Sequence, residues 1–295
     1  MAAMALAMAL VWGCAISHKT VVKPSGAPVP RLTATKQELL AAYNRQAESV
    51  TSLNAAVKLL LTAGSAYTGV IEQYHEVNGF ILAQKPASIR VIGQAPVVGT
   101  NIFDMESDGE TFHMFIPSRH KFLTGPANVE RQSGKPIENL RPQHLTRAIF
   151  WEPVPAQALV LFEEASDSTT QYYVLTVARP LAAAAPGADA AAPADWEIAS
   201  KIWFDRADLS VARLQTYEPG GKLGSDVRYG GWDQFGSGKY PRHISLARPG
   251  NDYKLEISVT RLTLGEAIAP DRFLLQQPPG SELVRVGEET QGTNP

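Results

Sequence analysis

Short segments that alternate apolar and polar residues fill most of the chain after Gly64. A period of two places successive side chains on opposite faces, which is the pattern of a half-buried β-strand. Turn sequences at Asp108-Gly109, Gly220-Gly221 and Pro249-Gly250-Asn251 separate several of these segments, as hairpins require. The sequence predicts strands over Gly69–His75, Val77–Gln84, Ser88–Ile92, Asn101–Ser107, Glu110–Ile116, Leu159–Glu164, Gln171–Arg179, Trp196–Asp205, Ser210–Glu218, Asp226–Phe235, Arg242–Arg248 and Tyr253–Leu262. An antiparallel sheet of about ten or eleven strands therefore dominates the expected α+β fold.

Helical spacing occurs before the strands and once between them. Thr35 and Glu38 have the spacing of a capping box at a helix N-terminus. Apolar residues follow at steps of three and four, and they predict one long helix of about seven turns. These residues are Leu39, Tyr43, Ala47, Val50, Leu53, Val57 and Leu60. A second, short helix is predicted over roughly Pro142–Trp151, with Pro153 ending it.

The hairpin around Asp108-Gly109 predicts a strongly apolar sheet face. A two-residue turn pairs Met105 with Phe112 and Phe103 with Met114, and it places Asn101 opposite Ile116. One helix is too small to cover such a wide sheet. The sheet therefore either curls into an incomplete barrel around the long helix, or its apolar face lines a ligand cavity. A plainly packed core remains an equal alternative for each of these residues.

The N-terminal residues have the pattern of a lipoprotein signal. Cys14, the only cysteine, follows the apolar stretch that ends at Gly13 and resembles the lipobox of bacterial lipoproteins. Residues 1–13 are then a signal peptide whose basic start lies further upstream. Residues 14–33 form a lipidated tether, 34–280 a single domain, 180–194 a disordered Ala/Pro-rich insertion, and 281–295 a flexible tail. The alternative for Cys14 is an ordinary buried thiol.

Composition and motif searches argue against several functions. The net charge is −2 without a basic stripe, which excludes a typical nucleic-acid binder. The histidines show no H-x-x-H or H-E-x-x-H spacing, and no G-x-S-x-G nucleophile motif occurs. An enzymatic site would need His75, His113 and Asp104 to converge in a cleft. We therefore expect no metal, no cofactor and no enzymatic activity.

Several segments resemble the LolA/LolB family of lipoprotein carriers and receptors. They are Phe80-Ile81-Leu82, Lys85–Arg90, the run from Ala95 to Pro117, Leu140–Pro155, Tyr229–Leu246 and Tyr253–Gly280. The resemblance implies an incomplete barrel closed by helices over a cavity for acyl chains. Pro96-Val97-Val98-Gly99 stands where the family's receptor has a Pro-Leu-Gly turn, so Val98 takes the place of the protruding leucine.

We therefore expect a lipid-anchored protein on the periplasmic face of the outer membrane. It binds acyl chains or another apolar ligand, with a periplasmic carrier protein as a further partner. The expected cavity residues are Leu82, Phe103, Met105, Phe112, Met114 and Ile116, with Leu145, Ile149 and Phe150 as a helical lid. Val97 and Val98 face membrane or cargo. The alternative is an accessory envelope lipoprotein of the same fold with a filled core.

Overall fold

The computed structural model describes residues 31–65, 70–128, 139–181, 195–236 and 238–287. Cys14, the expected signal peptide and most of the expected tether and Ala/Pro-rich insertion lie outside these residues. Within them, no helix is both long enough and apolar enough to span a membrane.

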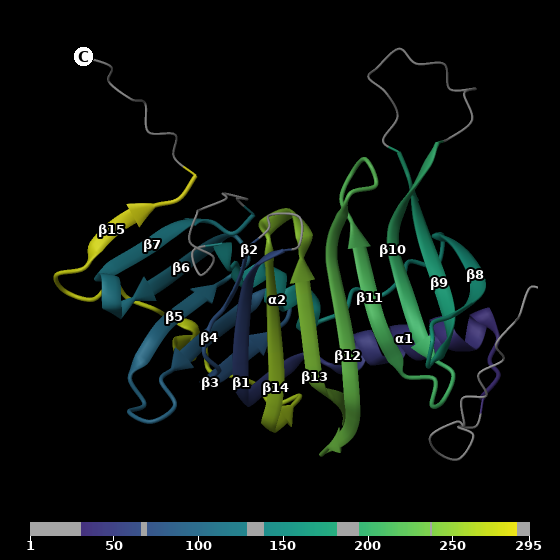
Figure 1. The fold of residues 1–295 in the computed structure, drawn as a ribbon, viewed down its shortest axis with the longest axis horizontal. Helices are drawn as coiled ribbons and strands as arrows, with labels where there is room; N and C mark the ends of the chain where they lie inside the picture. Colours follow the sequence, from purple (N-terminus) through teal and green to yellow (C-terminus); the bar gives the residue numbers. More distant parts are fainter. Residues whose placement is uncertain (1–30, 66–69, 129–138, 182–194, 237, 288–295) are drawn as a thin grey trace, which may run out of the picture. The chain divides into compact units, whose positions relative to one another are not determined.

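Strands make up most of the described chain (Figure 1). They are β1 Ser52–Ser65, β2 Val70–Gln73, β3 Val77–Gln84, β4 Ser88–Gln94, β5 Asn101–Ser107, β6 Thr111–Ile116, β7 Lys121–Pro126, β8 Leu159–Ser166, β9 Gln171–Pro180, β10 Trp196–Asp205, β11 Val211–Tyr217, β12 Leu223–Phe235, β13 Gly238–Arg248, β14 Tyr253–Leu264 and β15 Glu282–Arg285. The helices are α1 Lys36–Ser49 and α2 Pro142–Ile149, with 3-10 turns η1 Pro117–Arg119, η3 Pro249–Asn251 and η4 Pro270–Phe273.

All fifteen strands belong to one sheet, which is larger than the ten or eleven strands expected. Its order is β15-β7-β6-β5-β4-β3-β1-β14-β13-β12-β11-β10-β9-β8, and β2 pairs separately with β1. The pairs are antiparallel except for β15 with β7. Because β15 and β8 end this order without pairing to each other in the described chain, the sheet is open, as an incomplete barrel requires. Strand β15 falls within the segment expected to be a flexible tail.

The prediction of one long N-terminal helix is wrong for the second half of that segment. Helix α1 has 14 residues, and its capping box between Thr35 and Glu38 is present as predicted. From Ser52 the chain is strand β1, with Leu53 and Val57 buried between partners β3 and β14. Leucine and alanine permit both structures, but pairing on both sides gives β1 two ladders of hydrogen bonds. Tertiary pairing therefore overrides the local helical spacing.

The hairpin between β5 and β6 has a register two residues away from the predicted one. Met105 pairs with Met114 instead of Phe112. The loop is longer because the Asp108 carboxylate accepts hydrogen bonds from the backbone amides of Glu110 and Thr111, at 2.9 and 2.8 Å. A slip of two residues leaves every side chain on its original face. The predicted apolar face therefore remains intact despite the changed pairs.

Both helices lie against one face of the sheet, called here the inner face. Tyr43 of α1 stacks on Trp151, with ring centroids 5.3 Å apart, and Trp151 meets Tyr229 of β12 edge to face. The hydroxyls of Tyr229 and Tyr240 donate to the carbonyl oxygens of Ala148 and Ile149, at 2.9 and 3.2 Å. These bonds satisfy carbonyl groups that the end of α2 leaves unpaired. They hold α2 at a defined place on the inner face.

Candidate functional site

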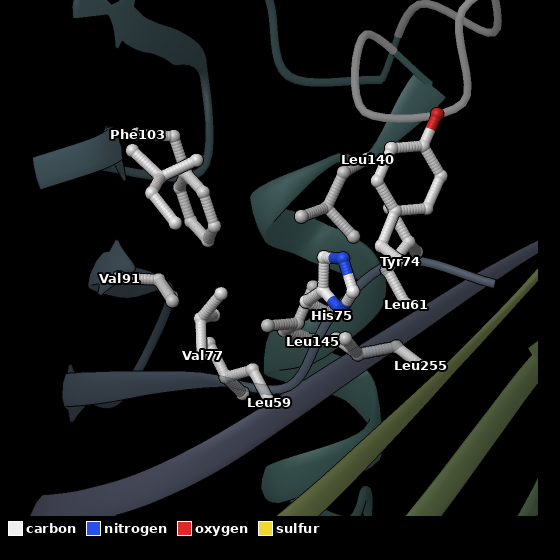
Figure 2. Close-up of a pocket in the computed structure, with 11 residues that line it drawn as sticks. Leu59, Leu61, Tyr74, His75, Val77, Val91, Phe103, Leu140, Leu145 and Leu255 are labelled. Atoms are coloured by element: carbon white, nitrogen blue, oxygen red, sulfur yellow. The ribbon is translucent and has the colours of Figure 1, made fainter. Parts of the chain in front are cut away.

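An apolar cavity of about 220 Å³ lies on the inner face beside α2 (Figure 2). Its lining residues come from β1, β3, β4, β5, β14, α2 and the links that precede β3 and α2. They are Leu59, Leu61, Tyr74, His75, Val77, Val91, Ile102, Phe103, Leu140, Leu145 and Leu255. Tyr74 and His75 are the two lining residues with polar side-chain atoms, so the cavity offers contact surface to hydrocarbon and few hydrogen bonds.

The cavity has a buried floor and an exposed rim. Leu59, Val91 and Leu145 are each at most 3% exposed and form part of the floor. At the rim, His75 is exposed and Tyr74 is half-buried. Figure 2 shows these two side chains on the same side of the cavity as Leu140 and Leu61. The exposure of His75 brings the cavity to the protein surface, where an apolar group can enter.

Two glycines on neighbouring strands make room for the side chains of the cavity floor. Gly79 of β3 pairs with Gly93 of β4. A Cβ on Gly79 would lie 2.8 Å from Leu59 Cδ1, and one on Gly93 would lie 2.4 Å from Phe103 Cε1. The Leu59 and Phe103 side chains therefore lie directly over glycine backbone. Larger residues at 79 or 93 would push these side chains toward the cavity.

Helix α2 reaches the cavity with Leu145, which is fully buried. Next to it, His144 Nδ1 lies 2.7 Å from the hydroxyl of Tyr253. Burial lowers the pKa of His144 well below 6.5, and the nearby cations Arg248, Arg141 and Arg147 lower it further. The imidazole is therefore neutral at physiological pH, which suits its position between a helix and an apolar sheet face.

The sequence-predicted cavity residues are divided among several places. Phe103 and Leu145 line the apolar cavity. The others from β5 and β6 lie within the closed core at 0 to 2% exposure, namely Met105, Phe112, Met114 and Ile116. Leu82 faces the outer side, in a depression near Arg272. Of the remaining lid residues, Ile149 is buried in the core and Phe150 lines a second cavity.

Sequence reasoning missed most of the cavity lining, and it missed Leu59 and Leu61 because it assigned β1 to a helix. Leu53, Ala55, Val57 and Leu59 are buried at alternate positions, and Asn54 between them is exposed. This alternation was a readable strand signal. Nothing local marks Leu140 or Leu255 as cavity residues, because they reach the site only through the tertiary fold.

The turn between β4 and β5 exposes two valines. Val97 is 94% and Val98 71% exposed. The turn is closed because the Ala95 amide donates to the Thr100 carbonyl at 2.9 Å, and Gly99 has a φ of +65° that favours glycine. A defined backbone therefore presents two neighbouring apolar side chains to the surroundings.

The polar residues considered for an enzymatic site do not gather around the cavity. Arg90 forms a bidentate ion pair with Asp104, with N–O distances of 3.0 and 2.8 Å, and His113 pairs with Glu106. These four residues lie on the outer side of β4, β5 and β6, whereas His75 lines the cavity on the inner face. Among the described residues, no group of three or more His, Cys, Asp or Glu side chains is arranged to hold a metal ion.

Comparisons with known proteins give similar folds but no sequence relatives. No protein-family model and no curated protein matches the chain. A LolA superfamily protein from Nitrosomonas europaea is 14% identical, with a TM-score of 0.45, over 82% of this chain and 99% of that chain. A DUF1329 family protein from Desulfovibrio piger is 10% identical, with a TM-score of 0.48, over 80% of this chain and 94% of that one.

A third solved structure is described as an outer membrane lipoprotein-sorting protein domain from Vibrio parahaemolyticus. It is 10% identical, with a TM-score of 0.47, over 79% of this chain and 94% of that chain. The resemblance to the LolA/LolB family that the sequence indicated is thus found again among solved structures. Because all three TM-scores are below 0.5, the function has to be argued from the cavity itself.

Proposed function

We propose that this protein binds an acyl chain, of a lipoprotein or a lipid, in the apolar cavity beside α2. One observation carries the proposal: a space of about 220 Å³ with an almost entirely apolar lining reaches the surface at Tyr74 and His75. Apolar cavities of roughly 150 Å³ stay free of water and bind small hydrocarbons. This cavity is larger, so it suits a segment of one alkyl chain.

The affinity of such a site comes from removing hydrocarbon from water. Each buried methylene contributes about 0.8 kcal/mol, so five methylenes contribute roughly 4 kcal/mol. That amount alone corresponds to a dissociation constant of about 1 mM. Binding of this kind is readily reversible, which suits a protein that receives a chain and passes it on. It requires neither a cofactor nor a chemical step, and we propose no enzymatic activity.

The anchoring and the direction of transfer form part of the same proposal. A diacylated Cys14 would hold the domain at the periplasmic face of the outer membrane, since two acyl chains give stable attachment. The exposed Val97 and Val98 would then touch the bilayer or the cargo during transfer. A periplasmic carrier that delivers the acylated cargo is the partner that fits this role.

Leu61→Glu tests the proposal at the cavity rim. Leu61 is half-buried, so its replacement can send a carboxylate to water while it makes the cavity entrance polar. Leu161→Glu on β8 is the matched control, because Leu161 is 58% exposed and lies outside the cavity. Native mass spectrometry and displacement of a fluorescent fatty acid measure binding.

We expect the natural protein and Leu161→Glu to bind the fatty acid equally, and Leu61→Glu to bind at least tenfold more weakly. Equal binding by all three proteins would place the acyl chain elsewhere. No binding by the folded natural protein would favour the alternative of an accessory envelope lipoprotein with a filled core.

A further inference from the structure

A second and larger cavity lies on the inner face, beyond the C-terminal end of α2. Its volume is about 500 Å³, within the range of about 300–1,000 Å³ typical of ligand sites. Strands β9 to β13, the end of α2, the segment that follows it and Tyr43 of α1 all contribute to it. It has no lining residue in common with the apolar cavity.

One part of this second cavity is apolar. Phe150 and Trp151 follow α2, and Val177 and Leu214 come from the inner face of β9 and β11. All four are at most 7% exposed. Trp151 is fixed by the stacked Tyr43 ring and by its Nε1–H, which donates to the Tyr229 hydroxyl at 2.9 Å. The apolar surface is therefore preformed.

Three arginines line the other part of the cavity. Arg179 pairs with Glu197 at 2.7 Å. Arg248 forms an ion pair with Glu218 at 3.6 Å, and its Nε–H donates to the side-chain oxygen of Asn251 at 3.0 Å. Arg147, exposed in the last turn of α2, has no ion-pair partner among the described residues. An unpaired guanidinium beside an apolar wall is suited to an anionic group, because its fork of N–H donors matches carboxylate and phosphate oxygens.

The charges around α2 agree with this assignment. Burial lowers the pKa of His144 most, and Arg248, Arg141 and Arg147 lie near enough to lower it further. Three cationic side chains are therefore gathered around α2. Two glutamates also line the second cavity. Glu152 is exposed, and Glu218 is one-third exposed beside Arg248.

We propose that this arginine-lined cavity binds an amphiphile that carries a phosphate group. The phosphate lies between Arg147 and Arg248, and the adjoining hydrocarbon lies on Phe150, Trp151 and Leu214. The site is separate from the acyl-chain cavity and does not depend on the function proposed for it. A phosphate alone lacks the apolar contact, and an uncharged amphiphile lacks the ionic one, so the site selects molecules that combine both.

Calorimetric titration of the full chain with octyl phosphate, inorganic phosphate and octyl glucoside tests this selectivity. We expect octyl phosphate to bind at least tenfold more tightly than either of the other probes. We also expect binding of octyl phosphate to survive Leu61→Glu, which blocks the apolar cavity. Equal affinity for octyl phosphate and octyl glucoside, or for octyl phosphate and inorganic phosphate, overturns the proposal.

Variants of Arg147 test the ionic contact. Arg147→Gln should weaken octyl phosphate binding about tenfold, since hydrogen bonds to charged groups are the stronger ones. Arg147→Lys should restore part of the loss by returning the charge. Arg261→Gln, at an exposed position of β14 outside both cavities, is the matched control and should bind normally. Unchanged binding by Arg147→Gln, or an equal loss in Arg261→Gln, overturns the assignment.

Discussion

The glycine beneath the Phe103 ring links the stability of this protein to the size of its apolar cavity. In the Gly93→Ala variant the new Cβ would lie 2.4, 2.8 and 2.9 Å from three atoms of that ring. Distances below 3.0 Å are essentially never found between a Cβ atom and a non-bonded heavy atom. The backbone at residue 93 has no positive φ, so alanine itself fits the strand. The ring must therefore move, and the cavity is the space open to it.

The expected magnitudes follow from two opposing effects. Alanine in a strand interior is favoured over glycine by roughly 0.5–1 kcal/mol. Overpacking of a core costs about 1–3 kcal/mol. We expect a net loss of about 1–2 kcal/mol in the free energy of unfolding. If the displaced ring excludes two or three methylenes of a bound chain, affinity falls by about 1.6–2.4 kcal/mol, or roughly fifteen- to sixty-fold.

Urea unfolding and fluorescent fatty-acid binding measure both effects. Gly230→Ala is the matched control, because a Cβ there has no atom within 4 Å, and its stability should be unchanged or slightly raised. In a double-mutant cycle, Phe103→Ala should cost about 1–2 kcal/mol less in the Gly93→Ala background than in the natural protein. Additive effects, to within about 0.5 kcal/mol, would refute the contact between ring and glycine.

Three further predictions concern the elements around the cavity. Tyr229→Phe should destabilise the protein by about 1–3 kcal/mol in urea unfolding, because the buried Trp151 Nε1–H loses its acceptor. His144 has a lowered pKa, so its contribution to stability is complete above pH 6.5 and falls as the pH decreases, by up to about 1.4 kcal/mol per unit. In thermal unfolding measured as a function of pH, the His144→Asn variant should lack this pH dependence of stability. Arg90→Lys should lower the free energy of unfolding by about 1–2 kcal/mol in the same assay, since lysine cannot keep the bidentate pairing with Asp104. An unchanged unfolding midpoint would contradict that role of Arg90.

Local sequence patterns were sufficient for most strands and for the sides on which their residues lie. The alternation in β5 and β6 predicted an apolar face with Met105 and Met114, and the structure buries both completely. The pairing around Asp108 was wrong by two residues, because the turn closes through side-chain hydrogen bonds that a two-residue turn lacks. Such a slip changes partners but not faces, which is why the prediction of the face survived.

Local residue patterns were enough to predict an α+β chain rich in antiparallel strands, the cap of α1, the short helix α2 and one apolar sheet face. That β1 is a strand depends on tertiary pairing, because β3 and β14 supply hydrogen bonds to both of its edges. The position of the cavity also depends on tertiary pairing, since its lining extends from Leu59 to Leu255 in the sequence. Periodicity depends on neighbouring residues, whereas a cavity depends on which distant strands pair and on which small residues leave space between them.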